Sequence, residues 1–158
     1  MWRRYWRAAA WAVPTGAAIG IAIYLAIYLT GNSAYRTYGG WGAFFHALAG
    51  GCVIGAVTAL AGVVGGALSL VIWDRKLLRS AGSRKAVGSI GAAGGAALFW
   101  LCVGLVSALV SPTDWSWFGV TGIFMAVAAP ITWIAADTLI GRAEERAERD
   151  GVEFRFNV

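Results

Sequence analysis

The stretch 46-HALAGGCVIGAVTALAGVVGGALSLVIW-73 decides the fold class, because it is apolar almost throughout and contains no acidic or basic side chain apart from one histidine. Small residues recur along it at helical spacing: Gly51, Gly55, Ala59, Gly62, Gly66 and Ser69. In water, each glycine would cost a helix about 1 kcal/mol relative to alanine. In lipid, small residues let a second helix approach closely, and the helix satisfies its own backbone. The stretch therefore predicts a central transmembrane helix packed through Gly51, Gly55, Gly62 and Gly66.

The composition of the whole chain supports a membrane protein. Of its 158 residues, 59% are hydrophobic and 13% are charged, whereas soluble domains have about 45–50% apolar and about 25% charged residues. The mean hydropathy is +0.66. The chain is therefore predicted to be an all-α, polytopic integral membrane protein with one small transmembrane domain over residues 1–140.

Three further apolar segments predict three further membrane-spanning helices, over about 8–29, 86–110 and 118–140. Each is long enough to cross a hydrocarbon core of about 30 Å. Pro14 and Pro130 lie inside the first and last of these segments and are candidate kinks or hinges, because proline interrupts the helical hydrogen bonds.

The central apolar stretch is longer than one membrane span. As one helix, residues 41–73 would extend about 50 Å at 1.5 Å per residue, which is longer than a simple span. We therefore expect residues 41–49 to form an interfacial or protruding segment and the span itself to cover about 50–72. Residues 30–40, with Gly and Asn, predict a polar break before it.

The start of the third helix also carries glycine at regular spacing. Gly88, Gly91 and Gly94 form a GxxGxxG pattern, and Gly95 follows directly. A phosphate-binding loop would need a preceding strand, so close packing on the glycine face of the central helix is the better interpretation. Gly91 and Gly95 are the predicted packing positions.

Basic residues predict the topology. The segments 1–7, 74–85 and 141–158 hold 12 of the 13 basic residues, and Arg36 is the exception. By the positive-inside rule these segments are cytoplasmic, which places both termini inside. They would also face anionic lipid headgroups. The first and third apolar segments follow basic residues, and the second and fourth follow turns that contain tryptophan. This alternation further suggests two tandem helical hairpins.

The C-terminal region 141–158 differs from the rest of the chain. Its charged first part predicts a cytoplasmic continuation of the fourth helix, with Glu145–Arg149 and Arg146–Asp150 as i,i+4 pairs and Gly151 as the stop. The last residues, VEFRFNV, alternate apolar and polar. That period of two predicts a strand-like tail.

Few residues carry chemistry. His46 and Asp137 are the candidate functional polar groups: His46 as a pH-sensing or interfacial histidine, and Asp137 as an intramembrane carboxylate or as a structural partner of Arg142. Cys52 and Cys102 have no metal-ligand spacing and are interpreted as small buried hydrophobes, with a disulfide as the alternative. No catalytic, cofactor-binding or metal-binding residue is predicted.

These features favour a non-enzymatic protein that acts as a subunit or accessory of a membrane complex through glycine-mediated helix packing. The alternative is an oligomeric small channel or transporter, including a pore-forming protein, for ions or small solutes. An intramembrane enzyme would have only His46 and Asp137. We expect no nucleic acid and a homo-oligomer or a membrane-protein partner. Arg outnumbers Lys 11 to 2, which is typical of high-GC bacteria and suggests a bacterial inner membrane.

Overall fold

The computed structural model describes residues 2–31, 33–74, 80–110 and 116–156, and within these ranges the chain forms four helices. They are α1 (Trp2–Thr30), α2 (Ser33–Asp74), α3 (Ala81–Val110) and α4 (Ser116–Phe156). Each contains a segment long and apolar enough to cross a membrane. The prediction of an all-helical, multi-pass membrane protein is confirmed at this level.

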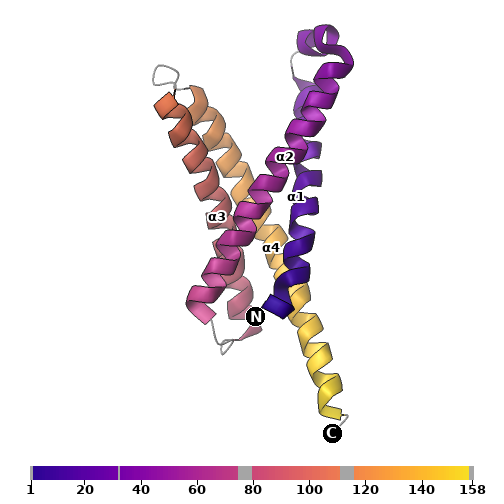
Figure 1. The fold of residues 1–158 in the computed structure, drawn as a ribbon, viewed down its shortest axis with the longest axis vertical. Coiled ribbons are helices and arrows are strands. Elements are labelled where there is room, and N and C mark those ends of the chain that lie inside the picture. The colour runs from indigo at the N-terminus through magenta and orange to yellow at the C-terminus, as the bar shows by residue number, and fades with distance from the viewer. Residues whose placement is uncertain (1, 32, 75–79, 111–115, 157–158) are drawn as a thin grey trace.

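The helices are arranged as two pairs that form a V (Figure 1). The first pair is α1 with α2 and the second is α3 with α4, and α2 packs on α3 to join the two pairs. We call the end of the molecule with the start of α1, the start of α3 and the end of α4 the basic end, because the described residues of the basic segments 1–7, 74–85 and 141–158 lie there. The pairs diverge toward the opposite end, where α1 ends beside the start of α2 and α3 ends beside the start of α4.

The α1–α2 contact is made by glycine facing glycine. A Cβ atom added to Gly51 would lie 2.6 Å from the carbonyl oxygen of Gly20, and one added to Gly16 would lie 2.7 Å from that of Gly55. Real Cβ atoms do not approach backbone so closely. The two backbones therefore come together because these positions have no side chain, which is the way small residues act between membrane helices.

The α2–α3 contact uses a second glycine face of α2. A Cβ at Gly65 would lie 2.7 Å from the Cα of Gly95, and one at Gly91 would lie 2.8 Å from the carbonyl oxygen of Gly65. Gly62 faces Thr132 of α4 and Gly66 faces α3. Of the GxxGxxG pattern, Gly88 and Gly91 lie at such contacts. A Cβ at Gly94 would have no neighbour within 4 Å, so the expectation of close packing was wrong for Gly94.

The start of α2 differs from the expectation. The backbone break lies at Gly40, where φ is 47° and ψ is −139°, a conformation that glycine alone adopts readily. Residues 41–49 then continue without interruption into the rest of α2, and Ala43 and Ala47 are buried. A separate protruding segment at 41–49 is therefore not present, because these alanines pack inside the molecule.

The end of α4 also differs from the prediction of a stop at Gly151. The helix continues through Gly151 to Phe156 and extends past the other helices at the basic end (Figure 1). The strand-like prediction for the tail was wrong for residues 152–156, and residues 157–158 lie outside the described part. A lone seven-residue strand leaves its backbone groups unpaired, whereas a helix already formed adds one hydrogen bond with each residue. Gly151 inside the helix costs about 1 kcal/mol, which is too little to end α4.

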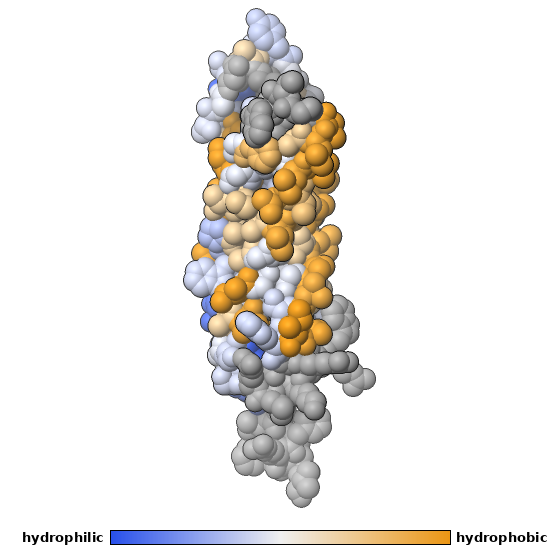
Figure 2. Space-filling model, turned by 90° about the vertical axis from the view of Figure 1, so that its left-hand side faces the viewer, coloured by the Kyte–Doolittle hydropathy of each residue, from blue (hydrophilic) through white to orange (hydrophobic). Residues whose placement is uncertain are grey.

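Large apolar side chains face outward along all four helices. Trp11, Ile72, Ile90 and Leu109 are among the exposed ones. Figure 2 shows ridges of strongly apolar residues over most of the height of one face of the molecule. An outer surface of this kind requires lipid or protein around it, because exposed apolar area of this extent is unfavourable in water.

Candidate functional site

The most strongly held polar group is a buried ion pair at the basic end. Arg84 of α3 donates two hydrogen bonds to Glu144 of α4, from Nε to Oε1 at 3.1 Å and from Nη2 to Oε2 at 2.8 Å. Arg84 is 7% exposed and Glu144 is 4% exposed. This two-pronged geometry is the strongest form of the arginine–carboxylate contact.

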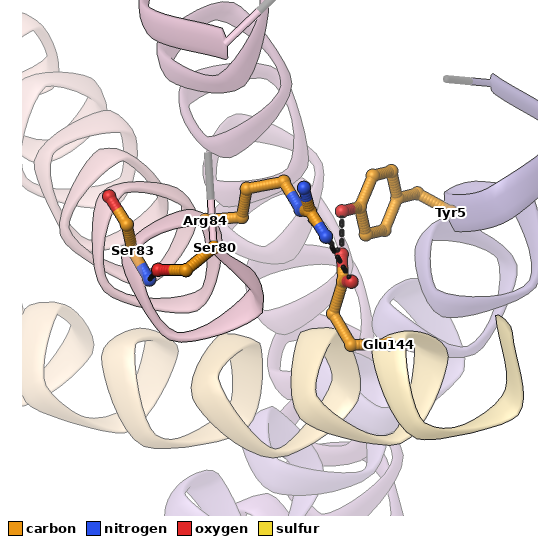
Figure 3. A network of polar contacts seen from close by, with 5 residues as sticks. All are labelled: Tyr5, Ser80, Ser83, Arg84 and Glu144. Carbon is orange, nitrogen blue, oxygen red and sulfur yellow. Dashed lines mark hydrogen bonds and ion pairs between the residues drawn. The ribbon is translucent and has the colours of Figure 1, made fainter. Parts of the chain in front are cut away.

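Tyr5 brings α1 into the same cluster, since its hydroxyl donates a hydrogen bond to Oε1 of Glu144. Figure 3 shows the three side chains converging from three helices. The contact connects the α1–α2 pair with the α3–α4 pair at the basic end. We call Tyr5, Arg84 and Glu144 the polar triad.

Local structure explains how Arg84 reaches this position. Ser80 precedes α3, and its hydroxyl accepts a hydrogen bond from the backbone N–H of Ser83 at 3.3 Å. This is the usual N-terminal cap, which fixes the first turn. The buried side of α3 then repeats every four residues, through Arg84, Gly88, Ala92, Ala96, Trp100 and Gly104. Arg84 is therefore the charged end of the packing face.

The polar triad places two opposite charges in the interior of the protein. Moving both ions out of water costs several kcal/mol each, and their mutual attraction offsets this only with good geometry. Here the two arginine bonds and the tyrosine hydroxyl satisfy the carboxylate from both sides. The triad is thus specific to one arrangement of three helices.

Asp137 lies near the triad but is paired separately. Its Oδ2 is 2.9 Å from Nζ of Lys85, with the two side chains 42% and 40% exposed. The sequence suggested Arg142 as the partner. Arg142 is five residues after Asp137 on the same helix, and its side chain is therefore rotated by about 140° away from that of Asp137. Lys85 lies on α3 and reaches Asp137 from the neighbouring helix. Half-exposed pairs of this kind contribute about 0.2–1 kcal/mol.

A neutral hydrogen bond lies deeper along the same two helices. The indole N–H of Trp133 donates to the hydroxyl of Ser89 at 3.0 Å, and that hydroxyl donates to the carbonyl of Ala86 at 3.1 Å. Ser89 is completely buried. Neither Ser89 nor Trp133 was singled out from the sequence, because one serine and one tryptophan in apolar segments carry no distinctive spacing.

Aromatic rings join the two helix pairs farther from the basic end. The ring of Phe124 stacks on Trp100 with a centroid distance of 4.6 Å, and Tyr24 of α1 stacks on Phe124 at 6.3 Å. The indole nitrogen of Trp100 is buried and has no hydrogen-bond acceptor among the described residues. Stacking and burial therefore hold this ring in place without help from its polar atom.

The other candidates from the sequence do not gather around the triad. His46 is exposed on α2 near the opposite end. Cys52 is half-buried on α2 and Cys102 is exposed on α3, and both are free thiols. Pro14 and Pro130 lie within α1 and α4, which continue across them. Their role as hinges stays a prediction.

The described residues contain no group of three or more His, Cys, Asp or Glu side chains suited to hold a metal ion. Among them, the polar side chains that meet between helices include Arg84 with Glu144 and Tyr5, Lys85 with Asp137, and Ser89 with Trp133. What this arrangement can do is connect helices. Comparison with protein families, curated proteins and solved structures finds no match to this chain.

One sequence signal could have revealed the triad. Arg84 lies four residues before Gly88, and Glu144 lies four residues after Ile140, so both charges continue the buried face of their helix. Because Arg84 and Glu144 fall in strongly charged segments, the sequence indicates two exposed cytoplasmic side chains instead. The hydroxyl of Tyr5 gave no such signal.

Proposed function

We propose that this chain is a non-enzymatic, multi-pass membrane protein that acts as a subunit or accessory of a membrane complex. The observation that carries the proposal is the presence of two kinds of glycine. Those at helix contacts, such as Gly55 and Gly65, are enclosed by neighbouring backbone. Gly94 of α3 and Gly119 and Gly122 of α4 have no neighbour within 4 Å of an added Cβ.

The open glycines have no packing role within this chain. A glycine inside a helix costs about 1 kcal/mol relative to alanine, and close approach of another helix is the usual compensation in a membrane. Gly119 and Gly122, with the exposed Ala126 after them, give α4 a smooth outer face in its first half. That face is suited to a helix of a partner protein.

The proposal includes a location. The distribution of basic residues supports a cytoplasmic basic end with both termini inside, and the composition supports a bacterial inner membrane. The packing of α1 on α2 and of α3 on α4 is compatible with two tandem helical hairpins. The same basic end would meet anionic headgroups of the bilayer.

The test is native mass spectrometry of the protein extracted gently from its own membrane. The wild-type protein is expected to carry a fixed mass surplus from another polypeptide. A Gly119→Leu/Gly122→Leu variant should lose that surplus and remain folded, since leucine is the better helix former and meets no atom at these positions. Gly82→Leu, also at an open glycine, is the matched control and should keep the partner.

Retention of the same surplus by the Gly119→Leu/Gly122→Leu variant would contradict the proposal. A variant at Gly55 would not serve this test, because Gly55 is enclosed by α1 and its replacement would disturb the fold itself.

The alternative is an oligomeric channel or transporter, whose pathway would need more polar lining than the cavity of about 650 Å³ between the two helix pairs offers. Thr58 and Thr132 are part of its lining, whereas Ser69 hydrogen-bonds within α2 and Asp137 is paired with Lys85. A closed homo-oligomer in the same mass spectrum would favour this function. Ion or solute flux into vesicles, reduced by Asp137→Asn, would then establish it.

A further inference from the structure

The cavity between the two helix pairs is apolar and runs along much of their length. It has a volume of about 650 Å³, within the range of about 300–1,000 Å³ that is usual for small-molecule sites. Its walls are mainly α1 and α4, and α2 contributes its base.

Small residues in the lining leave the space of the cavity open. Ala8, Ala12 and Gly16 line the α1 wall, and Ala128 and Ala136 are on the α4 wall. No charged residue is part of the lining. Among the described residues, the polar side chains of the lining belong to Tyr5, Thr15, Tyr24, Thr58, Trp100 and Thr132. Tyr5 donates to Glu144 and Thr15 to the carbonyl of Trp11. A lining of this kind does not replace the hydration shell of an ion or a polar solute, so the occupant is a hydrocarbon.

Two contacts between α1 and α4 lie near the two ends of the cavity, whose lining continues past the second of them to Ile27 and Val120. Tyr5 meets Glu144 at the basic end, and the ring of Tyr24 meets that of Phe124 at 6.3 Å. The 19 residues from Tyr5 to Tyr24 correspond to about 28 Å of helix, close to the hydrocarbon thickness of about 30 Å. The cavity therefore lies at the depth of lipid chains.

These two contacts distinguish between two hydrocarbon occupants. A straight transmembrane helix is about 10 Å across and would have to displace both contacts to pass between α1 and α4. A flexible lipid chain enters from the side and ends inside the cavity, so both contacts remain. The geometry thus favours a lipid chain over a helix of a partner.

Charge indicates which lipid. The segments 1–7, 74–85 and 141–158 at the basic end carry 12 basic and 6 acidic residues. Glu144 of these segments is already bound to Arg84, and Asp137, which lies just before the third segment, is bound to Lys85. Arg7 and Arg146 are exposed. A basic surface next to the bilayer attracts anionic headgroups at about 1 kcal/mol per basic residue.

We infer that the cavity is a lipid site, which takes an acyl chain of an anionic glycerophospholipid whose headgroup lies at the basic end. The inference does not depend on the proposed function, because the cavity is separate from the outer face of α4 with Gly119 and Gly122. It would hold for a complex subunit and for a transporter alike.

The test is photocrosslinking in phosphatidylcholine vesicles that contain a trace of phosphatidylglycerol with a photoactivatable group in its acyl chain. The full-length protein is reconstituted and irradiated, and the labelled peptides are identified by mass spectrometry. Labelling is expected to concentrate on cavity residues of α1 and α4. The same probe built on phosphatidylcholine should label those residues several-fold less.

Two variants fill the cavity from opposite walls, Ala12→Phe and Ala136→Phe, and each should lose most of the cavity labelling. The controls are Ala10→Phe and Ile134→Phe, at exposed positions of the same helices outside the lining. They should label as the wild-type protein does. Thermal unfolding of all four variants establishes that they are folded, and having two filling variants keeps the test decisive if one of them is not.

Three outcomes would overturn the inference. The first is labelling only at outward residues such as Ile72 and Leu109. The second is unchanged cavity labelling in both filling variants. The third is equal labelling by the two probes, which would overturn the preference for an anionic lipid.

Discussion

Helix α1 meets α2 and α4 in two different ways. Against α2 it uses Gly16 and Gly20, so that backbone lies on backbone along the first pair. Against α4 it uses side chains at two places, the Tyr5 hydroxyl on Glu144 and the Tyr24 ring on Phe124, with a cavity between them. Helix α1 therefore meets α2 along a continuous contact, whereas it meets α4 at separate points.

The difference shows how each kind of contact is specified. Glycine contacts require only that small residues recur on one face, and they tolerate no added atom. The polar triad requires three particular side chains to meet, and it tolerates no unpaired member. The first kind brings helices together, and the second selects one arrangement of the two pairs.

The largest expected effect comes from breaking the ion pair of the triad. Glu144→Gln leaves the Arg84 charge buried without its counter-ion, which destabilises proteins by about 3–5 kcal/mol. The free energy of unfolding, measured by titration with denaturing detergent, should fall by that order. Glu145→Gln is the control, since Glu145 is 66% exposed and lies 3.8 Å from Arg149. Equal effects of the two variants would show that the pair does not hold the helices.

A smaller effect is expected from a side chain added between α1 and α2. Gly55→Leu places atoms where the carbonyl of Gly16 and the Cα of Gly20 already lie, and overpacking of this kind costs about 1–3 kcal/mol, occasionally more. Gly42→Leu is the matched control on the same helix, because an added Cβ there has no neighbour within 4 Å. Comparable stability of both variants in the detergent titration would contradict the close contact of α1 with α2.

The smallest effect is expected from Tyr5→Phe, which removes one hydroxyl and leaves the ion pair intact. A hydrogen bond to a charged group contributes about 1.5–3 kcal/mol, and the lower figure applies because Arg84 still binds Glu144. Amide hydrogen exchange should rise in residues 5–14 of α1 and stay unchanged in residues 16–30, where glycines hold α2. Tyr38→Phe, at a position 91% exposed, should change neither. Faster exchange along all of α1 would show that the two contacts are not independent.

Much of this fold could be predicted from local sequence. The four apolar segments predicted four helices, and the regular spacing of glycine indicated which faces would meet. The errors lie where a local signal was weak. The alternation in the last residues suggested a strand, although α4 could continue through Gly151. The backbone break lies at Gly40, inside the predicted break of 30–40, but residues 41–49 continue directly into the rest of α2 instead of forming a separate protruding segment.

The sequence by itself determined that the chain is helical and apolar enough to span a membrane, because hydrophobicity and helical periodicity are properties of neighbouring residues. Only the tertiary structure decided which charges are buried and paired. Arg84 and Glu144 are 60 residues apart in the chain, and they meet because the rotation of α3 and α4 about their axes turns both toward one point. The cavity likewise depends on the angle at which the two pairs diverge, and no single segment specifies that angle.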